Sequence, residues 1–153
     1  MAGREDLGSW LEGPPTDPEG TSQLGLPPEG PGSLARLPRR VAALLVDWFV
    51  SLAVSGLLFP EDGAARGLLA GDRMATLAVF GVSSALLVGL LGHTIGHRLA
   101  GLRVVRVRDG RAPGPVAGVV RSALLVLVIP AVVWGRDGRG LHDVVAGTAI
   151  VRR

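Results

Sequence analysis

The stretch that decides the fold is VAALLVDWFVSLAVSGLLF, residues 41–59, in which Asp47 is the only charged residue. A helix of about 20 residues crosses a hydrocarbon core of about 30 Å, at a rise of 1.5 Å per residue. Two more apolar runs follow. Residues 74–95 contain no Asp, Glu or Arg. Residues 116–134 contain one charged residue, Arg121. Because runs this long favour helices in lipid, the sequence predicts an all-α membrane protein with about three transmembrane helices.

The overall composition agrees with this fold class. The 153 residues suffice for one domain, and the charged fraction of 19% is low. The mean hydropathy is +0.41. Cysteine is absent, which excludes disulfide frameworks, thiolate metal sites and thiol catalysis. These values favour a small integral membrane protein over a soluble domain.

The N-terminal residues differ from the rest of the chain. Residues 1–35 are rich in Gly and Pro, and their acidic residues outnumber the basic ones. Their apolar residues are too scattered to offset the entropy of ordering. No basic region precedes an apolar core, so a secretory signal peptide is not indicated. We therefore expect a disordered acidic tail over residues 1–35 and a membrane domain over residues 36–153.

The arginines indicate the orientation. Those before the first run and between the second and third runs are Arg36, Arg39, Arg40, Arg98, Arg103, Arg106, Arg108 and Arg111. By the positive-inside rule, the N-terminus and the second loop are cytoplasmic. Three complete spans would place the arginine-bearing C-terminus outside. The third segment, which contains Pro130, therefore spans the membrane, is re-entrant or lies shallow in it.

Two short segments favour β structure. Residues 102–108 are rich in valine and end at a turn signal, Asp109-Gly110, in the cytoplasmic loop. Residues 148–151 form the second segment. Pairing between them would require both to lie on one side of the membrane.

The charges within the apolar runs are the candidate functional residues. A carboxylate such as Asp47 is costly inside a membrane and needs a partner. Arg40 lies two turns earlier on the same helix face, and Arg121 would lie at a similar depth and could form a bidentate pair with Asp47. His93 would join this cluster from the cytoplasmic end of the second run, with His97 one turn later on its face. The cluster is either an ion, proton or head-group site, or a structural ion pair that sets helix register.

Other chemistry has weaker support. His93 and His97 lack the further ligands that a zinc site needs, so neither a metal nor another cofactor is predicted. The segment RGLHD, residues 139–143, has acid–base side chains but no nucleophile with a matched base, which argues against an enzyme. The arginines flank membrane segments and are not interleaved with aromatic residues, which argues against nucleic-acid binding.

Glycines recur along one side of the second run. They are Gly81, Gly89, Gly92 and Gly96. They either let a neighbouring helix approach closely or reflect the abundance of glycine in this chain.

Three motifs in order resemble the RDD family of small bacterial membrane proteins. They are RRVAALLVD at residues 39–47, GHTIGHRLAGLRVV at residues 92–105, and RGLHDVVAGT at residues 139–148. The resemblance implies that the chain lies in the cytoplasmic membrane of a bacterium, and that Arg40, Asp47 and Asp143 are signature residues. Together with Arg121, these residues form the expected intramembrane charged cluster. The expected supporting residues of this cluster are His93, His97, Arg139 and His142. In the family, Gln and Lys often stand in place of His93 and His97.

Two functions remain open at this stage. One is small-solute or ion transport with Asp47 as the charged centre. The other is a non-transport accessory or scaffold role, in which the chain binds a partner protein or anionic lipid. The expected partners are the lipid bilayer, anionic lipid head groups, and further copies of the chain or another membrane protein.

Overall fold

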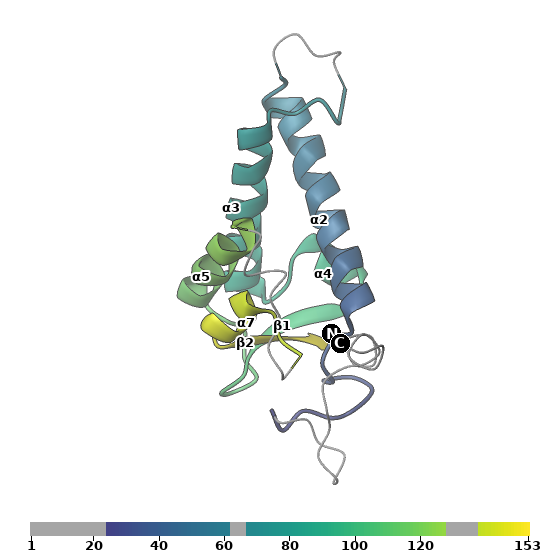
Figure 1. Ribbon diagram of the computed structural model, residues 1–153, viewed down its shortest axis with the longest axis vertical. Helices are drawn as coiled ribbons and strands as arrows, with labels where there is room; N and C mark the ends of the chain where they lie inside the picture. Colours follow the sequence, from purple (N-terminus) through teal and green to yellow (C-terminus); the bar gives the residue numbers. More distant parts are fainter. Residues whose placement is uncertain (1–23, 62–66, 128–137) are drawn as a thin grey trace, which may run out of the picture.

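The computed structural model describes residues 24–61, 67–127 and 138–153. Its elements are, in order, α2 (Leu37–Leu58), α3 (Arg73–Leu91), α4 (Ile95–Leu99), β1 (Leu102–Arg106), α5 (Pro115–Val126), α7 (Leu141–Val145) and β2 (Thr148–Arg152). The two long helices stand side by side above a small sheet (Figure 1). The short helices α4 and α7 lie near the sheet end. The chain is therefore mostly helical, with its short elements gathered at one end of a helical hairpin.

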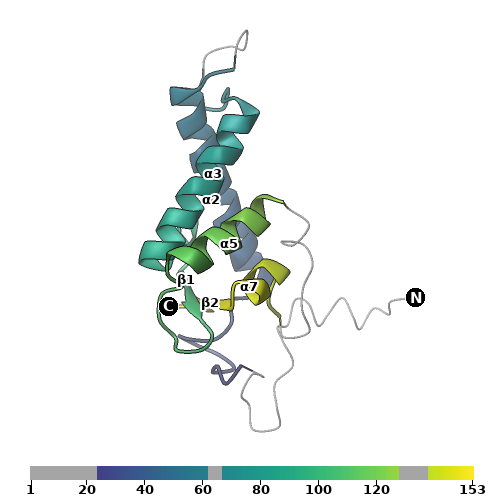
Figure 2. The same cartoon turned by 90° about the vertical axis from the view of Figure 1, so that its left-hand side faces the viewer.

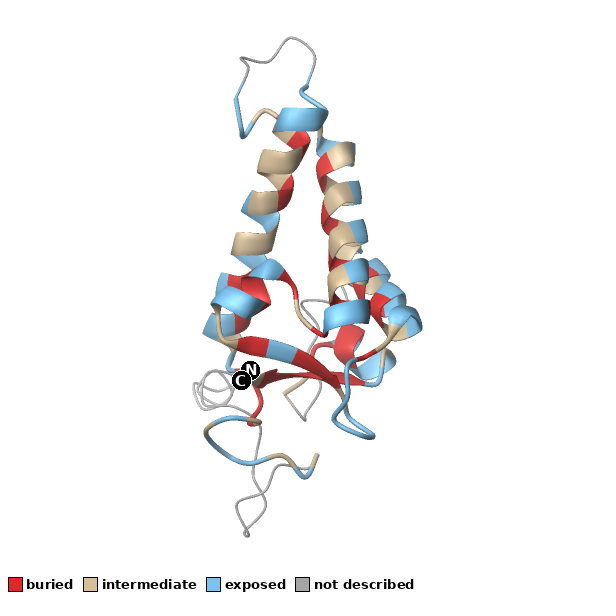
Figure 3. Cartoon of the chain, turned by 180° about the vertical axis from the view of Figure 1, so that it is seen from behind, coloured by how far each residue is buried: buried red, intermediate tan, exposed pale blue. Residues whose placement is uncertain are grey.

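The two long helices have the length and composition of membrane spans. Their 22 and 19 residues correspond to about 33 and 28 Å. The mean hydropathy of each is 2.1, yet only 17% of the apolar stretch of α2 and 28% of that of α3 is buried. Buried residues follow narrow strips where the helices face each other (Figure 3). Core helices of a soluble protein would be mostly buried, so these outward apolar faces call for lipid.

The far end of the hairpin is closed by local hydrogen bonds. The side chain of Asp72 caps α3 by accepting from the backbone N–H of Ala75 at 2.7 Å. The hydroxyl of Ser55 on α2 donates to the carbonyl oxygen of Asp72 at 3.2 Å. These bonds fasten the end of α2 to the beginning of α3.

The third apolar run differs from the first two. The predicted helix over residues 116–134 is observed as α5, which has 12 residues and ends at Val126. Residues 128–134 of the predicted segment lie outside the described residues. At about 18 Å, α5 is too short to cross a membrane, and it packs along α3 (Figure 2).

Glycines permit the contact between α3 and α5. A Cβ atom on Gly118 would come within 2.7 Å of the Ala85 carbonyl oxygen and of the Gly89 Cα atom. A Cβ atom on Gly81 would come within 3.1 Å of Val126. Close helix approach therefore explains Gly81 and Gly89 of the predicted stripe. Gly92 instead ends α3 in a left-handed conformation, with φ 73°.

The two β-prone segments form the sheet. Strand β1 pairs antiparallel with β2, with Leu102 opposite Arg152 and Arg106 opposite Thr148. Leu102, Val104 and Ile150 pack with Ala43 of α2 and Val88 of α3 to form a buried core. The C-terminal strand therefore lies at the same end of the hairpin as the loop that follows α3.

The predicted tail requires a correction at its C-terminal boundary. The backbone N–H of Ala35 donates to the Ile150 carbonyl at 2.8 Å, and that of Arg152 donates to the Ser33 carbonyl at 2.9 Å. Leu24 and Leu26 pack against a cluster formed by Leu34, Val105, Ala149 and Val151. Residues 24–35 are thus ordered against the sheet, because β2 offers an unpaired edge and an apolar face. Residues 1–23 of the predicted tail lie outside the described residues.

Candidate functional site

Asp47 fastens the short helix α4 to the long helix α2. The Thr94 hydroxyl donates to Asp47 Oδ2 at 2.5 Å, and the Gly96 backbone N–H donates to Asp47 Oδ1 at 2.7 Å. A Cβ atom on Gly96 would collide with the Ala43 carbonyl oxygen of α2 and lie 2.9 Å from Asp47 Oδ2. Glycine at position 96 therefore permits the contact, and both carboxylate oxygens of Asp47 are engaged.

A capping box fixes the beginning of α4. The Thr94 hydroxyl accepts from the His97 backbone N–H at 3.1 Å, and His97 Nδ1 accepts from the Thr94 backbone N–H at 3.3 Å. Thr94 and Gly96 are site residues that the sequence prediction missed. The available signal was the threonine three residues before His97, in the spacing of a helix cap.

The buried arginine of α5 pairs with α7 instead of α2. Arg121 Nε lies 2.7 Å from Asp143 Oδ1, and the two side chains are 2% and 0% exposed. The Thr148 hydroxyl donates to the same oxygen at 3.1 Å, and His142 Nε2 lies 3.5 Å from Asp143 Oδ2. The predicted Asp47–Arg121 pair is therefore wrong. The carboxylate of Asp47 is taken by α4, and α7 brings a closer carboxylate to Arg121.

The electrostatics around this pair keep Asp143 ionised. Burial alone would raise the pKa of Asp143, but the charge of Arg121, followed by those of His142 and Arg40, holds that pKa below its usual value. Burial, with a further contribution from Arg121, lowers the pKa of His97 to about 3. His97 is therefore neutral at neutral pH and is not placed to relay protons there.

A cavity of about 550 Å³ lies between α2, α3 and α5. Its apolar lining consists of Leu37, Val41, Leu44, Leu45, Trp48, Leu77, Phe80, Leu125, Val126 and Ile150. Its polar lining consists of Arg40, Asp47, Ser84, Thr94, His97, Arg121 and His142. Trp48 and Phe80 meet edge to face, with ring centroids 5.8 Å apart, and form a contact between α2 and α3. The cavity is thus apolar along the helices and polar near α4 and α7.

The polar end contains a donor that the pair with Asp143 does not use. Arg121 lines the cavity and is 2% exposed. Within residues 24–61, 67–127 and 138–153, its Nη1 atom has no hydrogen-bond partner. Buried polar atoms in proteins are nearly always hydrogen-bonded, so this guanidinium nitrogen calls for an explanation.

The structure thus brings together most of the predicted cluster, in a different arrangement. Arg40, His97, Arg121 and His142 line the cavity, whereas Asp143 pairs with Arg121. Arg139 donates to the Thr148 carbonyl at 3.4 Å, next to the carboxylate that Thr148 also binds. His93 Nδ1 lies 3.4 Å from the Thr94 carbonyl oxygen and is not part of the cavity lining.

Comparison with known proteins gives one result. A family model described as the RDD family matches residues 34–147. No curated protein and no solved structure matches the chain. The matched range contains the two long helices, the Arg121–Asp143 pair and every residue of the cavity lining except Ile150.

Proposed function

Because the chain belongs to the RDD family, we propose that it is a membrane protein that binds an amphiphilic ligand in the cavity between α2, α3 and α5. The observation that carries this proposal is the lining, which is apolar along the helices and polar at one end. Its volume of about 550 Å³ lies within the range of roughly 300–1,000 Å³ for small-ligand sites. The chain would act as a binding protein within the bilayer.

Access from the lipid is supported by the exposure of the cavity wall on α2. Val41, Leu44 and Leu45 line the cavity and are 44%, 40% and 52% exposed. A wall that remains this accessible does not enclose the cavity. Since α2 has the composition of a membrane span, the ligand would enter sideways from the bilayer.

The geometry favours ligand binding over ion transport centred on Asp47. A carboxylate that carries an ion must bind and release it. Both oxygens of Asp47 instead accept hydrogen bonds that hold α4 in place. The non-transport alternative, in which the chain binds lipid, therefore receives the stronger support.

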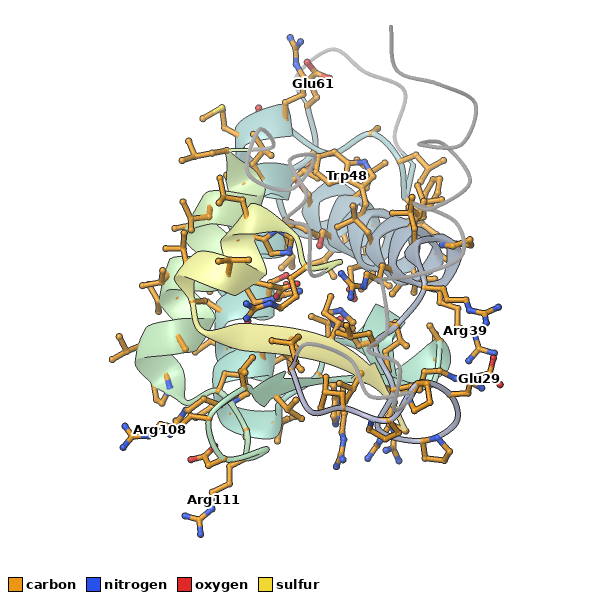
Figure 4. The ribbon with its side chains drawn as sticks, turned by 60° about the horizontal axis from the view of Figure 1, so that its bottom comes forward. Glu29, Arg39, Trp48, Glu61, Arg108 and Arg111 are labelled. Atoms are coloured by element: carbon orange, nitrogen blue, oxygen red, sulfur yellow. The ribbon has the colours of Figure 1, made fainter. Side chains whose placement is uncertain are left out.

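We also propose that both ends of the membrane domain are cytoplasmic. The beginning of α2, the end of α3 and the strand β2 lie at one end of the hairpin (Figure 1). Arg39, Arg108 and Arg111 project outward there (Figure 4). Such arginines follow the positive-inside rule, and each contributes about 1 kcal/mol against an anionic lipid surface.

Single cysteines test this orientation without background labelling, because the natural chain has none. In intact bacterial cells, Glu61→Cys, in the far loop, is expected to react with a membrane-impermeant maleimide. Arg111→Cys is expected to react only after the cells are permeabilised. The reverse pattern would contradict the proposed orientation.

The proposed binding is tested by fluorescence quenching of Trp48, which lines the cavity. Trp10 and Trp134 are replaced by Phe, and the full chain is reconstituted in lipid nanodiscs. Bromododecyl phosphate is expected to quench Trp48, and unbrominated dodecyl phosphate is expected to restore the fluorescence in a saturable way. The alkyl chain of a bound probe would place its bromine within the cavity.

A matched reporter separates the cavity from the surrounding lipid. In a Trp48→Phe/Phe49→Trp variant, the tryptophan is moved to a residue that is 55% exposed and does not line the cavity. Quenching there should reflect only the bulk membrane and should not be competed. Val41→Phe should weaken quenching of Trp48 by filling the cavity, whereas Val82→Phe, outside the lining, should not. Equal, non-competable quenching of both reporters would contradict the proposal.

A further inference from the structure

The polar end of the cavity indicates which head group the ligand carries. Resting on the cavity binding proposed above, we infer that the head group is an anionic oxygen acid, either a carboxylate or a phosphate monoester. Arg121 and Arg40 would bind it. The inference combines a buried donor, the balance of donors and acceptors in the lining, and the position of that lining along α2.

The buried donor is Nη1 of Arg121. The Nε atom of this guanidinium is used by Asp143 at 2.7 Å, whereas Nη1 has no hydrogen-bond partner among the described residues. A guanidinium has donors only, so an acceptor oxygen is what would satisfy it. Since Arg121 lines the cavity, an acceptor on a bound ligand can meet this requirement. Hydrogen bonds between arginine and an oxyanion are roughly twice as strong as neutral ones.

The donors and acceptors in the lining favour an anion. Arg40 and Arg121 line the cavity with a single carboxylate, that of Asp47. Both oxygens of Asp47 already accept hydrogen bonds from Thr94 and Gly96. Arg121 also pairs with the carboxylate of Asp143, so the two guanidinium groups are matched by two carboxylates. The preference for an anion therefore rests on the donors: neither oxygen of Asp47 is left without a donor, whereas Arg121 Nη1 is left without an acceptor among the described residues. A cationic head group would face two guanidinium groups instead.

The position along α2 matches the orientation of a lipid. Arg40 lies in the first turn of α2, at the arginine-rich end, whereas Trp48 lies about 12 Å farther along the helix. A head group at Arg40 and Arg121 would therefore lie near the membrane interface. The chain of the ligand would extend along Val41, Leu44 and Leu45 toward the bilayer centre. This is the orientation that an amphiphile already has in the cytoplasmic leaflet.

A series of probes with one chain and different head groups tests the inference. Bromododecyl phosphate, bromododecanoate, bromododecanol and bromododecyl trimethylammonium are compared by competable quenching of Trp48 in the full-length chain. We expect the two anions to bind at least about 10-fold more tightly than the alcohol, a difference of about 1.4 kcal/mol. The ammonium probe should bind most weakly.

The two possible failures are distinguishable. Equal competable affinity for all four probes would overturn the head-group inference and leave the proposed cavity binding intact. No competable quenching by any probe would overturn the proposed function itself.

Two variants assign the preference to the arginines. Arg121→Gln combined with Asp143→Asn removes both charges together and keeps a polar side chain at each position. No unpaired buried charge is left, so the fold is expected to survive. Arg40→Gln leaves both members of that pair in place. Each should reduce the anion preference to about 3-fold or less, because anion binding should fall more steeply than alcohol binding, whose neutral hydroxyl accepts a weaker hydrogen bond from a guanidinium. Arg39→Gln is the matched control, because Arg39 is exposed and does not line the cavity. An unchanged preference in correctly folded Arg121 and Arg40 variants would overturn the assignment.

Competition separates a lipid head group from a free anion of the same chemistry. Inorganic phosphate and acetate are added against bromododecyl phosphate. Neither is expected to displace it even in large molar excess, because the apolar wall contributes much of the binding. Displacement by inorganic phosphate at a comparable concentration would overturn the amphiphile as the source of the anion.

Discussion

Replacing Arg121 by Met is expected to lower the free energy of unfolding by about 3–5 kcal/mol, since it leaves a buried carboxylate without its charge partner. Asp143 is 0% exposed, and Arg121 Nε at 2.7 Å is its ion-pair partner. Asp143→Leu alone should destabilise the protein by a similar amount, because it leaves the guanidinium buried and uncompensated. The measurement is urea unfolding in mild detergent, followed by circular dichroism.

The double variant Arg121→Met/Asp143→Leu should recover most of this loss. Replacing a buried ion pair by apolar side chains of similar volume is often neutral for stability, and here the Thr148 hydroxyl would lose one acceptor, at about 1 kcal/mol. Additive losses in the double variant would contradict a direct pair. The pH dependence has a definite sign. Since the pKa of Asp143 is lowered in the folded protein, its contribution is present above the unfolded pKa of about 3.9 and is lost as the pH falls through the folded value.

Replacing Asp47 by Ala is expected to release α4 from α2. The Thr94 hydroxyl and the Gly96 backbone N–H would each lose an acceptor, at about 1–3 kcal/mol per buried group. Hydrogen exchange of residues 95–99 should accelerate, and binding in the cavity should weaken because Thr94 and His97 form part of its lining. Asp47→Asn should have a smaller effect, because its amide oxygen still accepts one of the two bonds.

Ser51→Ala is the matched control for Asp47. Ser51 lies one turn later on α2, and its hydroxyl donates only to the Asp47 carbonyl oxygen within the same helix, at 2.7 Å. Its loss should leave the exchange of residues 95–99 unchanged. An Asp47→Ala variant with wild-type unfolding and exchange would show that the carboxylate does not hold α4.

The long helices could be predicted because their signal is local. The runs at residues 41–59 and 74–95 correspond to α2 and α3, and their length and apolar composition suffice to identify a span. The β-prone character of residues 102–108 and 148–151 is local as well. It rests on β-branched residues in both segments and on the Asp109-Gly110 turn signal after the first, which can be identified without any tertiary contact. The RDD family was also identified from short motifs.

The partners of the charged residues could not be predicted, because they depend on tertiary arrangement. A prediction based only on the depth of each residue in the membrane pairs Asp47 with Arg121. The partner of Arg121 is instead Asp143, which lies beside it because α7 leads into a strand that pairs with β1. The capping of α4 by Asp47 depends on Gly96, whose missing Cβ matters only once α2 lies against it. The order of residues 24–35 likewise depends on an edge of β2 that the sequence of this segment does not reveal.

The most direct test is a crystal structure of the full chain grown with bromododecyl phosphate, with the bromine located by its anomalous scattering. Binding in the cavity predicts a bromine peak between α2, α3 and α5 near Trp48, with the phosphate oxygens in hydrogen-bond contact with Arg121 Nη1 and close to Arg40. Bromine found only on the outward faces of the helices, for example beside Phe49 or Val82, with no phosphate at Arg121, would contradict it.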